Sequence, residues 1–358
     1  MPLFGLRTLQ NLGKSAARFN VQLDPRRLKS VKAAVLKEFK KPLVVEDFKV
    51  DKKLKANQVR IKVNYCSVNP SDFEIIHGYH DFKPKLPFVP GYEVAGEVAE
   101  VGKAAAEAGF HKGDKVIGLN KESCGGFAEE CVVQTEDCFH IPQGVPLKIC
   151  SALLDGYTIS LLGLVRRGRI KEGDVVLITA AGGGVGLSAV DLAANVYKAK
   201  VIAVCSTEDK AALVRDKGAF AALKYSKNFP QEVNKITKGK GVNVIFDATG
   251  GEVFENALQC VSTEGKLILT SNAARSILSF NPNNLLPNAV SLIGVSPWHY
   301  RKNDIQTYVK TIEDVIDMAE QELISPHVSK EFTLEEVNDA FTYMTDATCT
   351  GKVVVRID

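Results

Sequence analysis

The sequence predicts an α/β protein that combines a β-rich, barrel-like unit with a doubly wound parallel sheet. Between Val31 and about Ile141, short apolar segments alternate with Gly, Pro and Asp, a pattern typical of antiparallel strands. From about Leu153 the apolar segments alternate with helical ones, which predicts parallel strands joined by right-handed crossovers. A glycine-rich turn at 181–184 lies between the first of these strands and the helix that follows it.

The first 30 residues differ in composition from the rest of the chain. Six basic residues stand against one acid, Asp24, and Leu3, Leu6, Leu9 and Leu12 follow near-helical spacing. Such a leader is typical of an organellar import peptide, here a mitochondrial one, and an unaddressed tail on a cytoplasmic protein is the alternative. The whole chain carries +3, so the residues after the leader sum to about −2 and give no basic surface for nucleic acid.

The β-rich unit contains most of the cysteines, and none of the eight cysteines forms a CxxC pair. Cys124, Cys131 and Cys138 are spaced seven apart within strand-like, punctuated sequence. We therefore predict neither a disulfide framework nor a structural zinc site. No stretch approaches the roughly 18 apolar residues of a membrane span, so none is expected.

The second half of the chain alternates strands and helices. The pattern predicts helices at 186–197, 208–218 and 304–320, and a final strand at 352–357. The strands expected in the parallel sheet are 175–180, 200–205, 242–249, 266–271 and 291–296.

The glycine-rich turn has the spacing of a nucleotide-binding corner. In the Rossmann dinucleotide fold, a turn of this kind presents helix N–H groups to a pyrophosphate. Gly183 would let the backbone approach the ligand, and Gly186 would let the helix pack closely on the strand. The alternative is a glycine-rich turn in an unrelated α/β fold. The residues expected to bind the cofactor here are Ala181, Gly183, Gly184, Val185 and Gly186.

The end of the second strand favours NADPH over NADH. NAD sites usually place a carboxylate there, whereas this chain has Cys205 and Ser206. Ser206, Lys210 and Tyr225 could bind a 2′-phosphate through charge-assisted hydrogen bonds. Glu208 lies near enough to leave NADH as an alternative, and Lys210 also suits an ordinary exposed helix position.

Several motifs together resemble the medium-chain dehydrogenase/reductase family, in its zinc-free quinone oxidoreductase (ζ-crystallin-like) branch. The resemblance covers essentially all of residues 31–358. Its motifs include VNPSDFEIIHG (68–78), LPFVPGYEVAGEVAEVG (86–102), GDVVLITAAGGGVGLSAV (173–190), FDATGG (246–251) and GKVVV (351–355).

The resemblance implies a domain division and a larger cofactor site. A leader (1–30) would precede a GroES-like catalytic domain, formed by 31–152 with 300–358, and a Rossmann NAD(P)-binding domain at 153–299. The cofactor-binding residues that the resemblance adds are Thr158, Thr249, Gly250, Ser296 and Lys352.

The same resemblance implies that zinc is absent. Zinc-dependent relatives carry a Cys at the position of Asn69 and a His at the position of Tyr92. The four-cysteine lobe that holds their structural zinc is also missing.

Three residues are candidates for the catalytic site. The amide of Asn69 could stabilise an oxygen that gains negative charge, and Tyr79 and Tyr92 could line the substrate cleft. The alternative is that Asn69 only caps a turn and that Tyr92 only packs in the core. The chain departs from the branch at Glu74 and Ile76, where relatives often have Tyr and Arg.

These observations predict an NADPH-dependent oxidoreductase that reduces a quinone, or an α,β-unsaturated ketone or aldehyde, without a metal. The alternative is an NADPH-binding protein with little turnover and a sensing or structural role. Because 291–296 would end the sheet with an apolar edge, a homodimer is expected, or a tetramer.

Overall fold

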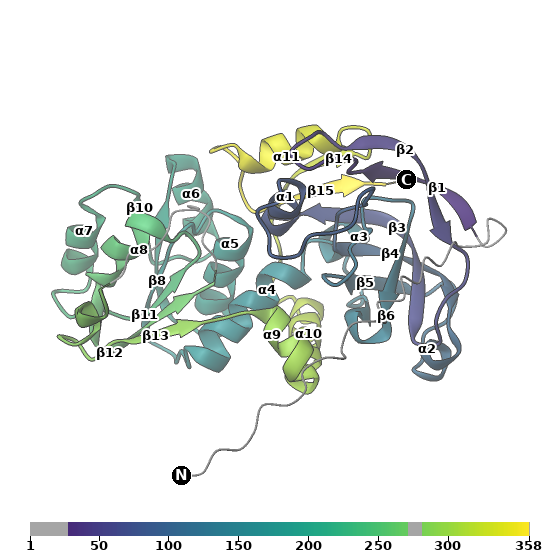
Figure 1. Cartoon of the computed structure of the whole chain (residues 1–358). Helices are drawn as coiled ribbons and strands as arrows, with labels where there is room; N and C mark the ends of the chain where they lie inside the picture. Colours follow the sequence, from purple (N-terminus) through teal and green to yellow (C-terminus); the bar gives the residue numbers. More distant parts are fainter. Residues whose placement is uncertain (1–27, 271–280, 358) are drawn as a thin grey trace, which may run out of the picture.

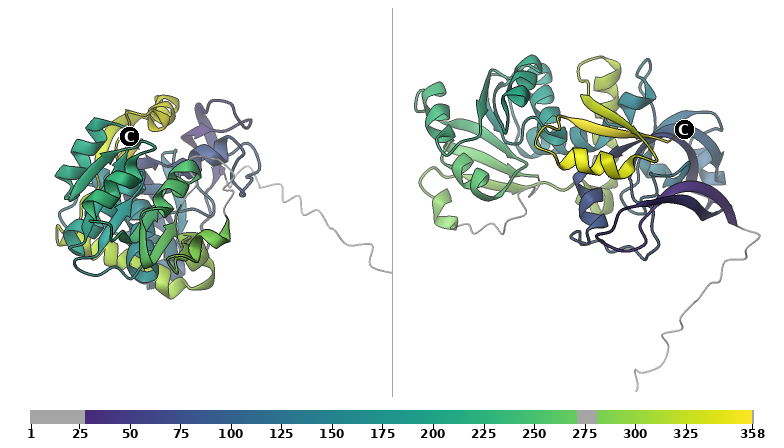
Figure 2. Two further views of the ribbon diagram at one scale, coloured as in Figure 1. Left: turned by 90° about the vertical axis from the view of Figure 1, so that its left-hand side faces the viewer. Right: turned by 90° about the horizontal axis from the view of Figure 1, so that it is seen from above.

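The computed structural model describes residues 28–270 and 281–357. Two lobes lie side by side, one built on a six-stranded sheet and the other on a seven-stranded sheet (Figures 1 and 2). Helices α4 (Leu154–Ser160) and α10 (Ile305–Glu320) lie between them (Figure 1). The predicted α/β fold class, with a parallel sheet and a β-rich unit, is confirmed.

The six-stranded sheet is entirely parallel. Its order is β10-β9-β8-β11-β12-β13, so the first two βα units run outward in one direction and the later ones in the other. Such an order opens a crevice at the carboxyl ends of the central strands β8 and β11. The strands are β8 (Val175–Ile178), β9 (Lys200–Cys205), β10 (Ala221–Lys224), β11 (Val242–Asp247), β12 (Val261–Leu269) and β13 (Ser291–Gly294).

Alternating side chains of this sheet form two cores. Val176 and Ile178 face one side, which is covered by α4, η3, α5 and α6, whereas Leu177 faces the side covered by α7 and α8. Both faces of the sheet are therefore buried, as a parallel sheet requires. The covering helices are η3 (Leu161–Arg167), α5 (Gly184–Asp191), its π-helical continuation η4 (Leu192–Val196), α6 (Glu208–Asp216), α7 (Phe229–Ile236) and α8 (Gly251–Leu258).

The seven-stranded sheet of the other lobe combines strands from the first half of the chain with two strands from its end. Its order is β14-β15-β3-β4-β5-β7, with β6 paired to β3, and only β14 and β15 run parallel to each other. The strands are β3 (Gln58–Val68), β4 (Glu93–Val101), β5 (Lys115–Leu119), β6 (Glu130–Gln134), β7 (Cys138–His140), β14 (Val328–Thr333) and β15 (Lys352–Arg356).

A separate antiparallel pair and several short helices complete the fold. The pair is β1 (Leu28–Val35) with β2 (Val44–Asp51). The remaining elements are α1 (Pro70–Ile76), α2 (Lys103–Glu107), η2 (Thr135–Asp137), α3 (Leu147–Cys150), η5 (Pro282–Leu285), α9 (Pro297–Asn303) and α11 (Val337–Thr345).

Strand β1 corrects the expected start of the folded chain. Leu28, Lys29 and Ser30, assigned above to the leader, pair with β2, and Lys29 forms an ion pair with Glu130. Backbone hydrogen bonds to β2 make these three residues part of a strand, and their composition alone did not predict that strand. The rest of the expected leader, residues 1–27, lies outside the described residues.

Several contacts join the two lobes and the helices between them, and two of these are described here. The guanidinium of Arg301 on α9 donates to both carboxylate oxygens of Asp137 in η2, at 2.7 and 2.9 Å, and Tyr308 on α10 donates to the same carboxylate at 3.2 Å. Just before β15, the N–H of Gly351 donates to the carbonyl oxygen of Gly182 at 2.8 Å. The second contact places β15 directly beside the glycine-rich turn.

Over the described residues, no helix is both long and apolar enough to cross a membrane.

Candidate functional site

The glycine-rich turn has the geometry of a phosphate-binding corner. Gly183 is the N-cap of α5, and the N–H groups of the first helical turn have no acceptor within the helix. A Cβ at Gly186 would lie 2.2 Å from the carbonyl oxygen of Ala180, so only glycine allows this close approach of helix and turn. A Cβ at Gly183 would meet only that same oxygen, at 3.4 Å, which leaves open space over the turn. A phosphate can therefore approach the backbone there.

A buried carboxylate fixes the second wall of this corner, at the end of β11. Asp247 accepts hydrogen bonds from the Thr179 hydroxyl at 2.5 Å and the Gly250 N–H at 2.9 Å. The Thr249 hydroxyl donates to the Thr179 hydroxyl at 3.1 Å. Burial raises the pKa of Asp247, although these hydrogen bonds act to lower it. The structure thus brings predicted residues Thr249 and Gly250 to the crevice between β8 and β11.

The residues predicted to bind a 2′-phosphate lie at neighbouring strand ends. Ser206 directly follows β9, and Tyr225 directly follows β10, with its N–H donating to the Cys205 carbonyl oxygen at 2.7 Å. Lys210, in the first turn of α6, packs its stem against Gly182, where an added Cβ would lie 2.7 Å from the Lys210 Cβ. Lys210 thus lies against the glycine-rich turn, and Ser206 and Tyr225 lie at the carboxyl ends of the next two strands.

Lys352 links the corner to a buried polar cluster. Its stem lies over Gly184, where an added Cβ would be 2.9 Å from the Lys352 Cδ. Its Nζ lies 2.7 Å from Glu93 Oε2 and also donates to Asn69 Oδ1. Asn69 Nδ2 donates to the same Glu93 oxygen at 3.2 Å. Both functional groups of the Asn69 amide are thereby oriented, and the corner and the cluster form one continuous site.

Tyr92 belongs to the second half of the same cluster. Its hydroxyl donates to Asp155 Oδ2 at 3.2 Å, and Lys121 forms an ion pair with Asp155 and lies 4.8 Å over the Tyr92 ring. Burial acts to raise the pKa of Asp155, but Lys121 and Lys352 outweigh it and hold that pKa below its usual value. Burial, with Asp155 beside it, raises the pKa of Tyr92 well above its usual value, so the phenol stays protonated.

Four members of this cluster were missed in the sequence. Glu93 and Asp72 lie within recognised motifs, Asp155 is an acid inside a long apolar run, and Lys121 gave no signal. Burial raises the pKa of Asp72 to about 7, although the N–H groups of Asn69 and Gly91 donate to it at 3.1 and 3.0 Å. A buried carboxylate of this kind is a recognised mark of functional sites.

The other predicted residues occupy more varied places. Asn69 and Tyr92 are only 1% and 2% exposed, whereas Tyr79 is 57% exposed and stacks on His77. The Ser296 side chain is the N-cap of α9, accepting from the His299 N–H at 3.3 Å. Roles for Tyr79 and Ser296 in the site therefore stay predictions.

Thr158, on α4, is buried, and its hydroxyl has no hydrogen-bond partner within the described part of the chain. Buried polar groups are nearly always hydrogen-bonded, so a missing partner points to a ligand. The neighbouring Ser160 hydroxyl, in contrast, donates to the Gly156 carbonyl oxygen at 2.8 Å. Thr158 therefore fits the predicted role in holding the cofactor.

The donors of the cluster do not fit a zinc ion. At the two positions compared above, the Asn69 oxygen accepts from Lys352 and the Tyr92 hydroxyl donates to Asp155. An ammonium group already neutralises Glu93 and another neutralises Asp155. Throughout residues 28–270 and 281–357, no three His, Cys, Asp or Glu side chains are grouped as metal ligands would be.

Comparisons with known proteins agree with this architecture. The chain matches the family models described as alcohol dehydrogenase GroES-like domain, over residues 55–143, and zinc-binding dehydrogenase, over residues 184–314. It is 37% identical to the quinone oxidoreductase-like protein 2 homolog of Nematostella vectensis, over 92% of this chain and 89% of that protein. It is 34% identical to quinone oxidoreductase-like protein 2 of Bos taurus, over 92% of this chain and 93% of that protein.

A solved structure shares the fold. It is a mycobacterial protein complexed with NADPH, and it superposes with a TM-score of 0.83 at 26% identity. The alignment covers 92% of this chain and all of the mycobacterial one.

Proposed function

Because this chain belongs to the medium-chain dehydrogenase/reductase family and is an oxidoreductase of the quinone reductase type, we propose that it uses NADPH to reduce a conjugated carbonyl compound. The substrate class is a quinone or an α,β-unsaturated ketone or aldehyde. One observation carries the proposal: Lys352 extends from the glycine-rich corner to Asn69, so a bound nucleotide and a reacting carbonyl would meet there.

The cofactor would be held by the glycine-rich turn, by Thr158 and by residues that follow β9 and β10. The first turn of α5 would bind the pyrophosphate, and the hydroxyl of Thr158 would supply a hydrogen bond from the buried side. Ser206, Lys210 and Tyr225 would bind the 2′-phosphate, since no carboxylate stands at the end of β9 to repel it. The mycobacterial protein of the same fold, solved with NADPH, supports NADPH as the cofactor. When bound, NADPH supplies the hydride.

The chain's own residues would stabilise the charge that hydride transfer creates. A carbonyl oxygen becomes negative as the hydride arrives, and preorganised donors in a water-excluded site lower that barrier. Lys352 and Glu93 hold the Asn69 amide in one orientation, and only one of its two N–H groups is used by Glu93. Asn69 therefore donates to the developing oxyanion, and the Lys352 ammonium stabilises it electrostatically. Because its pKa is raised, Tyr92 stays protonated and does not act as a base.

We propose that the reaction needs no metal. The support is the donor set itself, in which Lys352 and Lys121 occupy the carboxylates that a cation would need. Elemental analysis of purified, active protein tests this point. Zinc at one equivalent per chain, with activity lost on chelation and restored by zinc, would overturn it.

Steady-state assays across a panel of quinones and enones test the activity. Consumption of NADPH by the wild type should fall by about two to three orders of magnitude in Asn69→Ala, whose lost donor resembles an oxyanion-hole residue. Calorimetry should give nearly the same NADPH affinity for both proteins. NADPH binding without consumption with any acceptor would instead identify a binding protein.

Two further proposals concern the protein's location and assembly. We propose that the leader directs the chain to mitochondria. Fusion of residues 1–30 to a fluorescent reporter would test this, and a reporter that stays in the cytoplasm would refute it.

The assembly proposal rests on strand β13. It pairs only with β12 among the described strands, and Leu292 on it is 40% exposed. An edge of this kind suits a homodimer, or a tetramer, and a stable monomer in sedimentation would refute that.

A further inference from the structure

A hollow of about 580 Å³ on the six-stranded lobe is lined mainly by cationic side chains. It lies over the middle of β12 and β13 and against the end of η3, away from the glycine-rich corner, which follows the carboxyl end of β8. Its lining contains no acidic side chain. The residues are Arg166, Arg167, Arg169, Lys266, Ile293 and Tyr300.

The positive charge of this hollow is only partly neutralised. Arg166 lies 3.6 Å from Asp304 and 5.4 Å from the centre of the Tyr300 ring. Arg167 and Arg169 are exposed, and among the described residues neither has an ion-pair partner. At least two guanidinium groups therefore remain available to an anion.

These cations are more than the C-terminus of η3 needs for capping. Lys266 donates to the carbonyl oxygen of Gly168, at the end of η3, at 2.7 Å. A helix C-terminus carries only about half an elementary negative charge, which this one ammonium satisfies. The surplus guanidinium groups have the planar, forked geometry that binds phosphate and carboxylate in two-point contacts.

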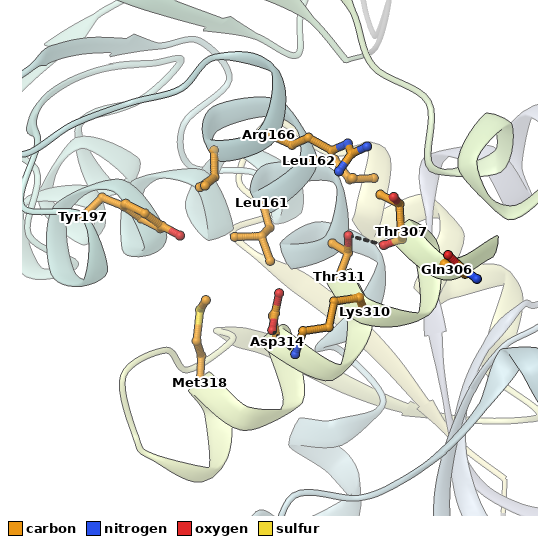
Figure 3. A pocket seen from close by; sticks show the side chains of 11 residues that line it. Leu161, Leu162, Arg166, Tyr197, Gln306, Thr307, Lys310, Thr311, Asp314 and Met318 are labelled. Carbon is orange, nitrogen blue, oxygen red and sulfur yellow. Dashed lines mark hydrogen bonds and ion pairs between the residues drawn. The ribbon is translucent and has the colours of Figure 1, made fainter. Parts of the chain in front are cut away.

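A second hollow, of about 510 Å³, shares Arg166 with the first and lies between η3 and α10 (Figure 3). Apolar side chains from both helices point into it, with the ring of Tyr197 at one side. Lys310 and Asp314 pair at 2.9 Å on its rim and cancel each other's charge. The apolar residues are Leu161, Leu162, Val165 and Met318.

We propose that the two hollows form one binding site for an amphipathic small-molecule anion. Arg167 and Arg169 bind its phosphate or carboxylate head, and the groove between η3 and α10 holds its hydrocarbon chain. The cationic first hollow suits the charged head. The second hollow suits the chain, because its apolar side chains lie beside polar Gln306, Thr307 and Thr311 and a neutralised Lys310–Asp314 pair. The site is separate from the nucleotide corner and does not depend on the proposed reductase activity.

Calorimetric titration of the full chain with three probes tests the pairing of head and chain. Octyl phosphate should bind at least about tenfold more tightly than inorganic phosphate, because the groove would bury its methylene groups. Octanol, which lacks the charge, should also bind at least about tenfold more weakly than octyl phosphate. Equal affinities for octyl phosphate and inorganic phosphate would overturn the role of the groove.

Matched variants test which residues are responsible. Arg167→Gln/Arg169→Gln should weaken octyl phosphate about tenfold or more, while Lys238→Gln/Lys240→Gln, an equal charge change on exposed residues elsewhere, should not. Equal losses in both pairs would mean a diffuse electrostatic effect and overturn the site.

One groove variant and two further measurements complete the test. Met318→Gln should remove the preference for octyl phosphate over inorganic phosphate. NADPH affinity should be unchanged by Arg167→Gln/Arg169→Gln, and a loss of it would place the anion site within the nucleotide site. Because Ile293 belongs to the edge strand, sedimentation of the same samples should show an unchanged oligomeric state; a change would overturn direct binding.

Discussion

A methyl group added at Gly186 should destabilise the lobe with the parallel sheet. The new Cβ would lie 2.2 Å from the carbonyl oxygen of Ala180 and 2.8 Å from the Ala181 Cα, whereas ordinary contacts lie at 3.4–4 Å. The turn would have to move by more than 1 Å, yet the N–H groups of Thr179 and Ala181 hold it to β11 and β9 on either side. Overpacking against backbone costs about 1–3 kcal/mol, a fall in Tm of roughly 2–12 °C.

Two matched variants make this prediction specific, with circular dichroism melts as the assay. Gly294→Ala, where an added Cβ meets nothing within 4 Å, should leave Tm nearly unchanged. Gly183→Ala should also keep its Tm but weaken NADPH binding in calorimetry, because its methyl group would project into the space over the turn. A Gly186→Ala protein that melts with the wild type would refute the packing argument.

Three other perturbations test separate parts of the molecule. Ser206→Glu should shift the coenzyme preference toward NADH in steady-state assays, because the carboxylate would repel a 2′-phosphate; an unchanged preference would contradict the placement. Burial raises the pKa of Asp72 to about 7, so the folded chain holds a proton that the unfolded chain loses near pH 4. The free energy of unfolding should therefore fall by up to roughly 4 kcal/mol from pH 4 to 7, and urea titrations should show that Asp72→Asn lacks this component. Equal pH slopes would contradict it. Arg301→Met would leave Asp137 buried and unpaired and should cost about 3 kcal/mol, measured by thermal melts; Asp137→Asn/Arg301→Met together should cost less than the single variant.

Much of the parallel sheet could be predicted because its strands carry their own signals. β9 begins and ends where its apolar run does, and β8, β11 and β13 lie inside the predicted segments. β10 was not predicted, because its sequence AALK is short and its composition suits a helix equally well. Only its pairing with β9 defines it as a strand. β14 was missed for a similar reason, because its place depends on β15, which returns from the end of the chain.

Only those parts of the candidate site whose residues lie close together in the sequence could be predicted. The corner at Gly183–Gly186 follows from one strand, one turn and one helix. Asn69 and Lys352 are 283 positions apart and Glu93 and Lys352 are 259 apart, so no spacing rule could join them. The structure shows Ser296 as the N-cap of α9, and its role in the site stays a prediction.

Transfer of isotope from the nicotinamide tests the central claim most directly. NADPH carrying deuterium in place of both hydrogens on the reactive ring carbon would be incubated with the wild-type protein and a conjugated enone, and the product analysed by mass spectrometry. We expect one deuterium in each product molecule, placed on the carbon that receives the hydride. A reduced product without deuterium, or no reduction of any acceptor by protein that binds NADPH, would contradict it.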